Sequence, residues 1–302
     1  MKRQPQIRWL ADGRRLHLLD GPIDLIVEAQ GSEANLRTAY HAAIHRLSGL
    51  LDDLCDELPV LRSAADPARC VLNGAVARRM HAAVAPYAID HFITPMAAVA
   101  GSVAEEILGA MLRDVSLDRA YVNNGGDIAL HLADGEEFTV GLIDRPDQFG
   151  MMRTTAIHSS DPSRGVATSG RHGRSFSLGI ADAVTVLART AAQADAAATI
   201  IANAVDLPGH PAIVRCPAED LQPDSDLGAR LVTRDVGPLK EFEIVSALDA
   251  GSDMARALLA SRLIDGAALH LQGRTRVVAL KGFGASVRRA ASPQQIENAV
   301  YA

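Results

Sequence analysis

Three polar side chains on one predicted helix are the residues whose spacing best suits chemistry. Residues 191–205 are almost all alanine and isoleucine, and Asp195, Thr199 and Asn203 interrupt them at intervals of four. That interval stacks the side chains on one face of an α-helix. A carboxylate on so apolar a helix needs a partner, because burying an unpaired charge is costly. A hard cation such as Mg²⁺ would suit this polar stripe, since it accepts carboxylate, hydroxyl and carbonyl oxygens and usually completes its shell with water and substrate phosphates.

The alternative interpretation is structural, because buried polar groups are normally hydrogen-bonded for structural reasons. Neighbouring backbone groups, or an arginine from the preceding segment, would then satisfy the polar stripe. That segment runs Gly165-Val-Ala-Thr-Ser-Gly170 and continues with two arginines. A guanidinium binds phosphate as readily as a carboxylate, so both interpretations use the same side chains. The candidate phosphate- or cofactor-binding residues here are Thr168, Ser169, Gly170, Arg171, Arg174 and Ser175.

A second candidate element is the sequence Asn123-Asn124-Gly125-Gly126, followed by Asp127. Asparagine and glycine tolerate positive φ, so this turn can direct several backbone N–H groups at an anion or a carbonyl. An ordinary tight turn is the competing interpretation, with Asp127 capping it. Asp127 and Asp182 are the candidate catalytic carboxylates, and the sequence does not decide between them and Asp226.

Composition narrows the classes of function. Aromatic residues make up only 4% of the 302 residues, which disfavours a stacking platform for single-stranded nucleic acid. The net charge of −6 also lacks the basic footprint of a nucleic-acid-binding protein. No run reaches the roughly 18 apolar residues of a membrane span, and the N-terminus has no signal-peptide core. Three cysteines at unrelated spacings are typical of reduced thiols. A cytoplasmic protein is therefore expected.

Hydrophobic periodicity and turn residues predict a chain that mixes strands with helices. Early strands are expected at 6–10, 15–19 and 21–28, and helices at 35–58, 74–84 and about 95–113. Gly101 in the last of these helices indicates either the close approach of another backbone or a ligand, or simple helix packing. Later strands are expected at 121–132, followed by a hairpin at Asp134-Gly135 and a return strand to residue 143, and at 182–187. Beyond them come the helix at 191–205, one or two helices within 239–264, and a hairpin around 272–274. A turn is expected at 223–228, where Asp224 and Asp226 more often serve structure than a metal. A flexible tail is expected over 285–302.

The order of the motifs NNGGDI, VATSG, VTVLA and ADAAAT resembles the ApbE superfamily, the FAD:protein FMN transferases. Members of that superfamily carry a GGD turn, a TSG loop, a VTV strand and an A-D-A-x-A-T helix. The chain is still more similar to a cytoplasmic branch with the motifs GPIDL, ELP-x-LR, PMAAVAG, GRSFSLGIADAVTV and PDSDLG, matched over residues 21–228. The resemblance implies an α+β fold related to the T-fold, with antiparallel sheets backed by helices. It also implies a single domain, with sublobes of about 1–115 and 116–285 as a possible division.

In that superfamily the helix Asp and Thr bind Mg²⁺, which holds the FAD pyrophosphate; Asp195 and Thr199 match them. The transferases have a longer segment between TSG and VTV, and a Lys-Gly-Tyr helix start where this chain has Ala-Ala-Val-Ala-Gly-Ser at 97–102. One hypothesis is therefore an enzyme that binds FAD or FMN with Mg²⁺ and cleaves or transfers at the pyrophosphate. The second is a non-catalytic flavin- or pterin-binding accessory protein, and the third a scaffold with an empty site. The expected partner is a small-molecule nucleotide, with a homodimer compatible with the alanine-rich helices and the acceptor protein undefined.

Overall fold

A nine-stranded antiparallel sheet forms the centre of the computed structural model, which describes residues 4–143, 152–279, 288–289 and 300–301. Every neighbouring pair of strands in this sheet is antiparallel. In spatial order the strands are β1 (Gln6–Trp9), β2 (Leu16–Asp20), β3 (Ile23–Gln30), β4 (Arg119–Asn124), β5 (Asp127–Leu132), β8 (Gly165–Ser169), β9 (Ala183–Ala188), β12 (Gly266–Leu271) and β13 (Arg274–Ala279).

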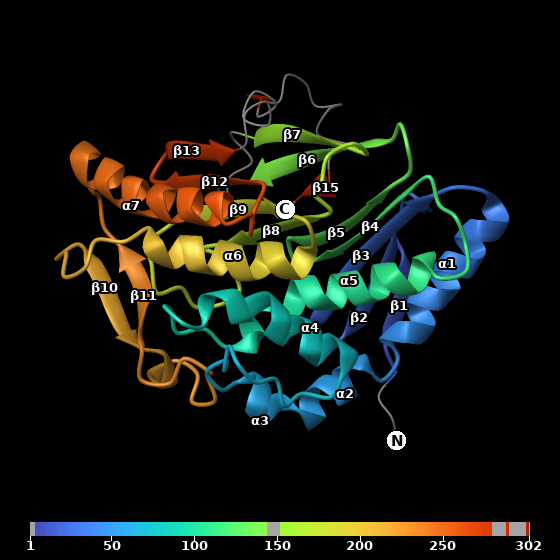
Figure 1. The fold of residues 1–302 in the computed structure, drawn as a ribbon, viewed down its shortest axis with the longest axis horizontal. Coiled ribbons are helices and arrows are strands. Elements are labelled where there is room, and N and C mark those ends of the chain that lie inside the picture. Colours follow the sequence, from blue (N-terminus) through green and yellow to red (C-terminus); the bar gives the residue numbers. More distant parts are fainter. Residues whose placement is uncertain (1–3, 144–151, 280–287, 290–299, 302) are drawn as a thin grey trace.

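The helices cover one face of this sheet (Figure 1). Four of them follow one another across it: α1 (Glu33–Leu47), α5 (Val99–Leu112), α6 (Ala191–Ala204) and α7 (Glu241–Ala260). Helix α4 (Ala75–Val84) packs on α5 and α6, and the short α2 (Leu50–Asp56) and α3 (Leu58–Leu61) lie farther from the sheet. Because nearly every alanine of α6 is buried, its small side chains let the neighbouring helices and strands approach closely.

A smaller four-stranded sheet lies on the opposite face, as Figure 1 shows for β6 (Glu137–Ile143) and β7 (Met152–His158). Its outer strands are β14 (Arg288–Arg289) and β15 (Val300–Tyr301), which fall within the predicted tail; most other tail residues lie outside the described part. Tyr121, Ile128, Phe138 and Val140 are among the buried residues between the two sheets. The α+β class predicted from the sequence is confirmed. A separate hairpin, β10 (Ile213–Pro217) with β11 (Leu231–Val236), stands at one end.

Two local predictions are wrong, and each has an identifiable cause. The expected helix at 35–58 breaks into α1, α2 and α3, because Gly49 adopts a φ of 85° between the first two. Pro59 is the second residue of α3 and lies in the first turn of a helix instead of ending one. The expected hairpin around residues 134–135 also fails, since β6 leaves the main sheet and β8 takes its place beside β5.

The segment Pro95–Leu112 is long and apolar enough by length and composition to cross a membrane, contrary to the expectation that no stretch would be. More than half of it is buried inside the fold. It comprises a short 3₁₀ turn, Pro95–Ala98, and helix α5, which contacts α1, α6, β4 and β5. An apolar helix enclosed in this way is what the core of a layered domain requires.

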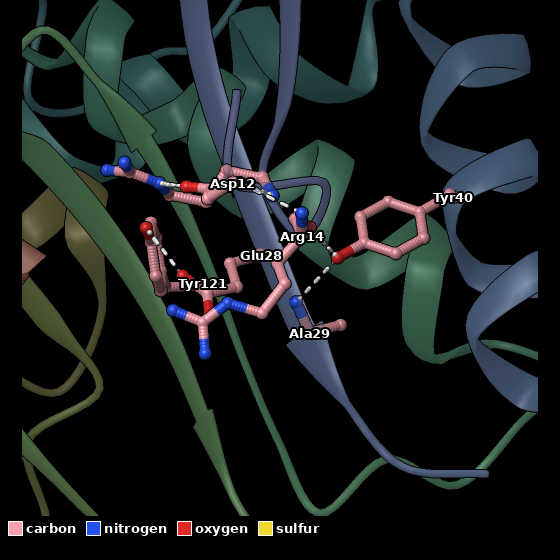
Figure 2. Close-up of polar contacts among 7 residues, drawn as sticks. Asp12, Arg14, Glu28, Ala29, Tyr40 and Tyr121 are labelled. Atoms are coloured by element: carbon pink, nitrogen blue, oxygen red, sulfur yellow. Dashed lines mark hydrogen bonds and ion pairs between the residues drawn. The ribbon is translucent and has the colours of Figure 1, made fainter. Parts of the chain in front are cut away.

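The N-terminal hairpin is anchored by a buried tyrosine (Figure 2). The Tyr40 hydroxyl on α1 donates to the Arg14 carbonyl at 2.8 Å and accepts the Ala29 N–H at 3.0 Å. Asp12 accepts the backbone N–H groups of the turn it begins, which holds the pKa of that carboxyl well below its usual range. On the neighbouring strand, Tyr121 donates to Glu28 at 3.2 Å. The Tyr40 bonds hold the β1–β2 turn against β3, and the Tyr121–Glu28 bond joins β4 to β3.

Candidate functional site

The site begins where α5 crosses the start of α6. A Cβ atom added to Gly101 would lie 2.3 Å from the carbonyl oxygen of Ala191, so only glycine permits this approach. The sequence left open whether Gly101 served a close backbone contact, a ligand or simple helix packing. The structure places the α6 backbone against it. The close approach brings the first turn of α5 beside the side chain of Asp195, one turn into α6.

Asp195 accepts hydrogen bonds from the first turn of α5. The Gly101 N–H donates to Oδ2 at 3.0 Å, and the Ala100 N–H also bonds to this carboxyl group. The residue that precedes α5, Ala98, has no side chain able to cap it, so a residue distant in sequence supplies the acceptor. Burial nevertheless raises the pKa of Asp195 to about 7, because losing water costs its charge more than the two amides return.

A second carboxylate makes the reciprocal contact between the same two helices, from α5 to the first turn of α6. Glu105 of α5 accepts the Ala192 N–H in the first turn of α6 at 2.7 Å. Its other oxygen lies 3.2 Å from Arg79 of α4. Each helix thus caps the other, Asp195 capping α5 and Glu105 capping α6. This exchange fixes the position of α6, and with it the direction in which Asp195 and Thr199 face.

The predicted Gly-Gly turn forms the tip of the β4–β5 hairpin. Gly125 and Gly126 have φ angles of 67° and 111°, as a two-residue turn of this kind requires, and Asn124 pairs with Asp127 across it. The Gly126 N–H donates to Asn123 Oδ1 at 2.8 Å. Asn124 is buried, and its amide donates to the Ala100 carbonyl at 3.2 Å. Both asparagine side chains therefore hold the tip in place beside the start of α5.

Asp127, the residue that follows this tip, interacts electrostatically with Asp195. Burial raises the pKa of Asp127 well above its usual range, and the negative charge of Asp195 raises it further. The backbone N–H of Thr168 and the positive charge of Arg174 lower the pKa, but they do not outweigh the other two effects. Two carboxylates that disfavour each other's ionisation in this way hold a proton near neutral pH, or share a cation.

The remaining predicted residues differ in what they contact. Thr168, opposite Thr185 on β9, shares a hydroxyl hydrogen bond with it at 2.7 Å. Thr199 is partly exposed one turn after Asp195, and its hydroxyl has no hydrogen-bond partner among the described residues. Asn203 accepts the Leu178 N–H at 3.0 Å, which is the structural role left open for this stripe. Ser169 ends β8, the buried Gly170 follows it, and Ser175 is exposed in the next loop.

Asp182 lies in a separate buried cluster. Its Oδ1 accepts Nε and Nη2 of Arg171 at 2.8 and 2.7 Å and is 3.2 Å from His172 Nε2. Its Oδ2 accepts the Gln272 N–H at 2.5 Å, in the turn between β12 and β13. Because both oxygens are occupied and the side chain is only 3% exposed, this geometry favours a structural role for Asp182. It also commits Arg171 to a carboxylate instead of a phosphate.

The two acidic residues of the predicted turn at 223–228 are engaged by other side chains. Asp224 pairs with Arg62 at 2.9 Å, and Asp226 accepts a hydrogen bond from Thr94. Within the described ranges, no group of three or more His, Cys, Asp or Glu side chains is arranged to hold a metal ion. A cation at Asp127 and Asp195 would therefore have to complete its shell with hydroxyl, carbonyl, water or ligand oxygens. That is how Mg²⁺ is usually bound.

Sequence reasoning missed Glu105 and the amides of Ala100 and Gly101. Glu105 carries no motif of its own, since an acidic residue within a helix is normally solvated. A signal was present in the small residues around Gly101, which mark a close helix crossing. Only the tertiary arrangement reveals that the crossing joins α5 to the predicted metal-binding helix.

The chain thus combines an α+β fold with a pair of half-buried carboxylates beside a Gly-Gly turn. A family model described as AbpE bacteria matches residues 7–277, and the chain belongs to that family, which is ApbE-related as the motifs predict. The UPF0280 protein of Methanopyrus kandleri is 35% identical over 183 residues, covering 60% of this chain and 69% of its own length. The UPF0280 protein of Methanococcoides burtonii is 33% identical over 178 residues, which cover 56% of this chain and 67% of that protein. The UPF0280 protein of Methanothrix thermoacetophila is 40% identical over 114 residues, which cover 37% of this chain and 46% of that protein.

Proposed function

We propose that this protein binds a flavin nucleotide, FAD or FMN, together with Mg²⁺ at Asp127, Asp195 and Thr199. The observation that carries the proposal is the pair of carboxylates, each with a raised pKa, between the β4–β5 tip and the start of α5. A divalent cation removes the repulsion between two half-buried carboxylates. Asp195 keeps lone pairs beyond those used by the two amides, and Thr199 adds a hydroxyl oxygen.

The phosphates of the nucleotide would lie toward Arg174 and the Gly-Gly tip. Arg174 is exposed and adjacent to Gly125, whereas Arg171 is held by Asp182. We assign the phosphate contact to Arg174 for this reason. Mg²⁺ would supply charge neutralisation of the pyrophosphate and of the oxygen that leaves when it is cleaved. The residues of this chain would hold and orient the pyrophosphate, and Asp127 would lose the proton that its raised pKa favours when the cation binds.

A non-catalytic flavin- or pterin-binding protein is the second candidate. One observation favours it: Asp182, a candidate catalytic residue, is fully engaged by Arg171 and Gln272. The short segment between β8 and β9 then serves to position a binding loop. Under this proposal the ligand remains intact, and the cytoplasmic location expected from the sequence suits either candidate.

Flavin fluorescence separates the two candidates. In FAD the stacked adenine quenches the flavin, so cleavage to FMN produces a slow rise after Mg²⁺ is added and none in EDTA. We expect Asp195→Asn to abolish Mg²⁺-dependent binding, because the amide still accepts the two α5 N–H groups but no longer attracts a cation. Asp253→Asn, on the exposed surface of α7, is the matched control. Immediate, stable quenching in place of the slow rise would identify a binding protein, and equal FAD affinity in Asp195→Asn would refute the metal assignment.

A further inference from the structure

Arg174 lies against the hairpin tip of the candidate site. A Cβ atom added to Gly125 would be 1.8 Å from Arg174 Nη2 and 2.7 Å from Cζ, so the guanidinium occupies the space that a side chain at Gly125 would fill. Gly125 is itself exposed and has a φ of 67°. The absence of a side chain at Gly125 therefore permits both the turn conformation and the close approach of the arginine.

Backbone hydrogen bonds hold the loop that carries Arg174, while the side chain of Arg174 is exposed to solvent. The Arg171 N–H donates to the Ala181 carbonyl at 2.9 Å, and the Gly173 N–H donates to the Gly170 carbonyl at 3.1 Å. Arg174 makes no hydrogen bond or ion pair with an acidic side chain among the described residues, and it is exposed. Its guanidinium can therefore leave Gly125 without loss of a buried contact or movement of the loop backbone.

The guanidinium is the positive charge that the described structure places beside Asp127, two residues along the chain from Gly125. A cation bound by Asp127 and Asp195 would be repelled by it at short range. A phosphate group bound between the cation and Arg174 removes this repulsion, because the anion attracts both. Cation and phosphate should then bind more tightly together than separately, which is a coupling free energy between two ligands.

We infer that Arg174 makes cation binding at Asp127 and Asp195 depend on a bound phosphate, so that the site selects a metal–phosphoanhydride complex over the free ion. This inference rests on the proposed function and adds the residue that sets its selectivity. A neutral residue at 174 would leave a pair of carboxylates open to the free cation. The present arrangement instead discriminates against Mg²⁺ unless the diphosphate accompanies it.

Isothermal titration calorimetry of the full-length chain tests this inference with Mg²⁺ alone, inorganic pyrophosphate alone, and each in the presence of the other. In the wild type we expect each ligand to raise the affinity for the other about tenfold or more. Arg174→Gln should bind Mg²⁺ alone about tenfold more tightly than the wild type, bind pyrophosphate more weakly, and lose most of the coupling. Arg37→Gln, at an arginine on α1 whose side chain is 71% exposed, is the matched control for the loss of one charge.

A second variant, Gly125→Ala, keeps the arginine but displaces its guanidinium, since the added methyl group would collide with it. It should weaken the coupling without removing the charge. Coupling in Arg174→Gln equal to that of the wild type would overturn the role of Arg174 while leaving the metal site intact. A wild-type protein that binds neither Mg²⁺ nor pyrophosphate, separately or together, would instead overturn the proposed function, and the selectivity with it.

Discussion

Asp195→Asn tests how much the free energy of unfolding falls when the protein keeps an ionised carboxylate between α5 and α6. Burial raises the pKa of Asp195 to about 7, against an ordinary value of 3.8. Between these two values the folded protein holds a proton that the unfolded chain releases. The free energy of unfolding therefore falls as the pH rises from about 4 to about 7, and stays constant above that range. A difference of about three pKa units corresponds to roughly 4 kcal/mol.

Asparagine removes this pH dependence and keeps an oxygen for the Gly101 and Ala100 N–H groups. At pH 8 without divalent cations, we expect Asp195→Asn to be more stable than the wild type by as much as roughly 4 kcal/mol. Near pH 4.5, where the wild-type carboxyl group is neutral, the two should be nearly equal. Urea unfolding in EDTA at both pH values, followed by circular dichroism, measures the difference.

Asp253→Asn, whose side chain is exposed, should leave the stability at both pH values within about 0.5 kcal/mol of the wild type. Mg²⁺ added together with pyrophosphate at pH 8 should stabilise the wild type much more than Asp195→Asn. If Asp195→Asn were instead less stable than the wild type at pH 8, the carboxylate would be ionised and favourably paired in the native state. The reasoning from burial would then be refuted.

Three further substitutions probe the scaffold, each by the change in the free energy of urea unfolding. Gly101→Ala should cost about 3 kcal/mol, because its methyl group would lie 2.3 Å from the Ala191 carbonyl oxygen; a change below 0.5 kcal/mol would show that the helices separate easily. Gly49→Ala should cost only about 1–2 kcal/mol, since the residue has a φ of 85° in open space; a larger loss would indicate an unseen contact. Tyr40→Phe should cost about 1–3 kcal/mol by leaving the buried Ala29 N–H without its acceptor, and an unchanged stability would contradict that bond's role.

Local patterns in the sequence were sufficient for the parts of the site that lie on single elements. The NNGGD sequence predicted a tight turn because glycine allows positive φ, and Gly125 and Gly126 both adopt it. The apolar run at 191–205 predicted a buried helix, which is α6 within one residue at its end. The interval of four between Asp195 and Thr199 predicted that both side chains lie on the same face of that helix.

Contacts between distant segments could not be obtained in this way. Nothing in the sequence near Asp182 indicates that the Gln272 N–H, 90 residues later, occupies one of its oxygens. Similarly, the partner that the charge of Asp195 required is the start of α5, which depends on how two helices cross. The strand after Asp134-Gly135 was assigned to a hairpin by local turn chemistry, but pairing in a sheet is decided by non-local packing.

The position of a bound cation tests the central claim most directly. Crystals grown with Mn²⁺, as an anomalous scatterer in place of Mg²⁺, and with FAD would locate the ion independently of the protein atoms. We predict one anomalous peak within direct ligand distance of Asp195, with Asp127 and Thr199 beside it and the pyrophosphate oxygens completing its shell. FAD bound at the hairpin tip with no peak there, or a peak at another cluster of carboxylates, would contradict the account.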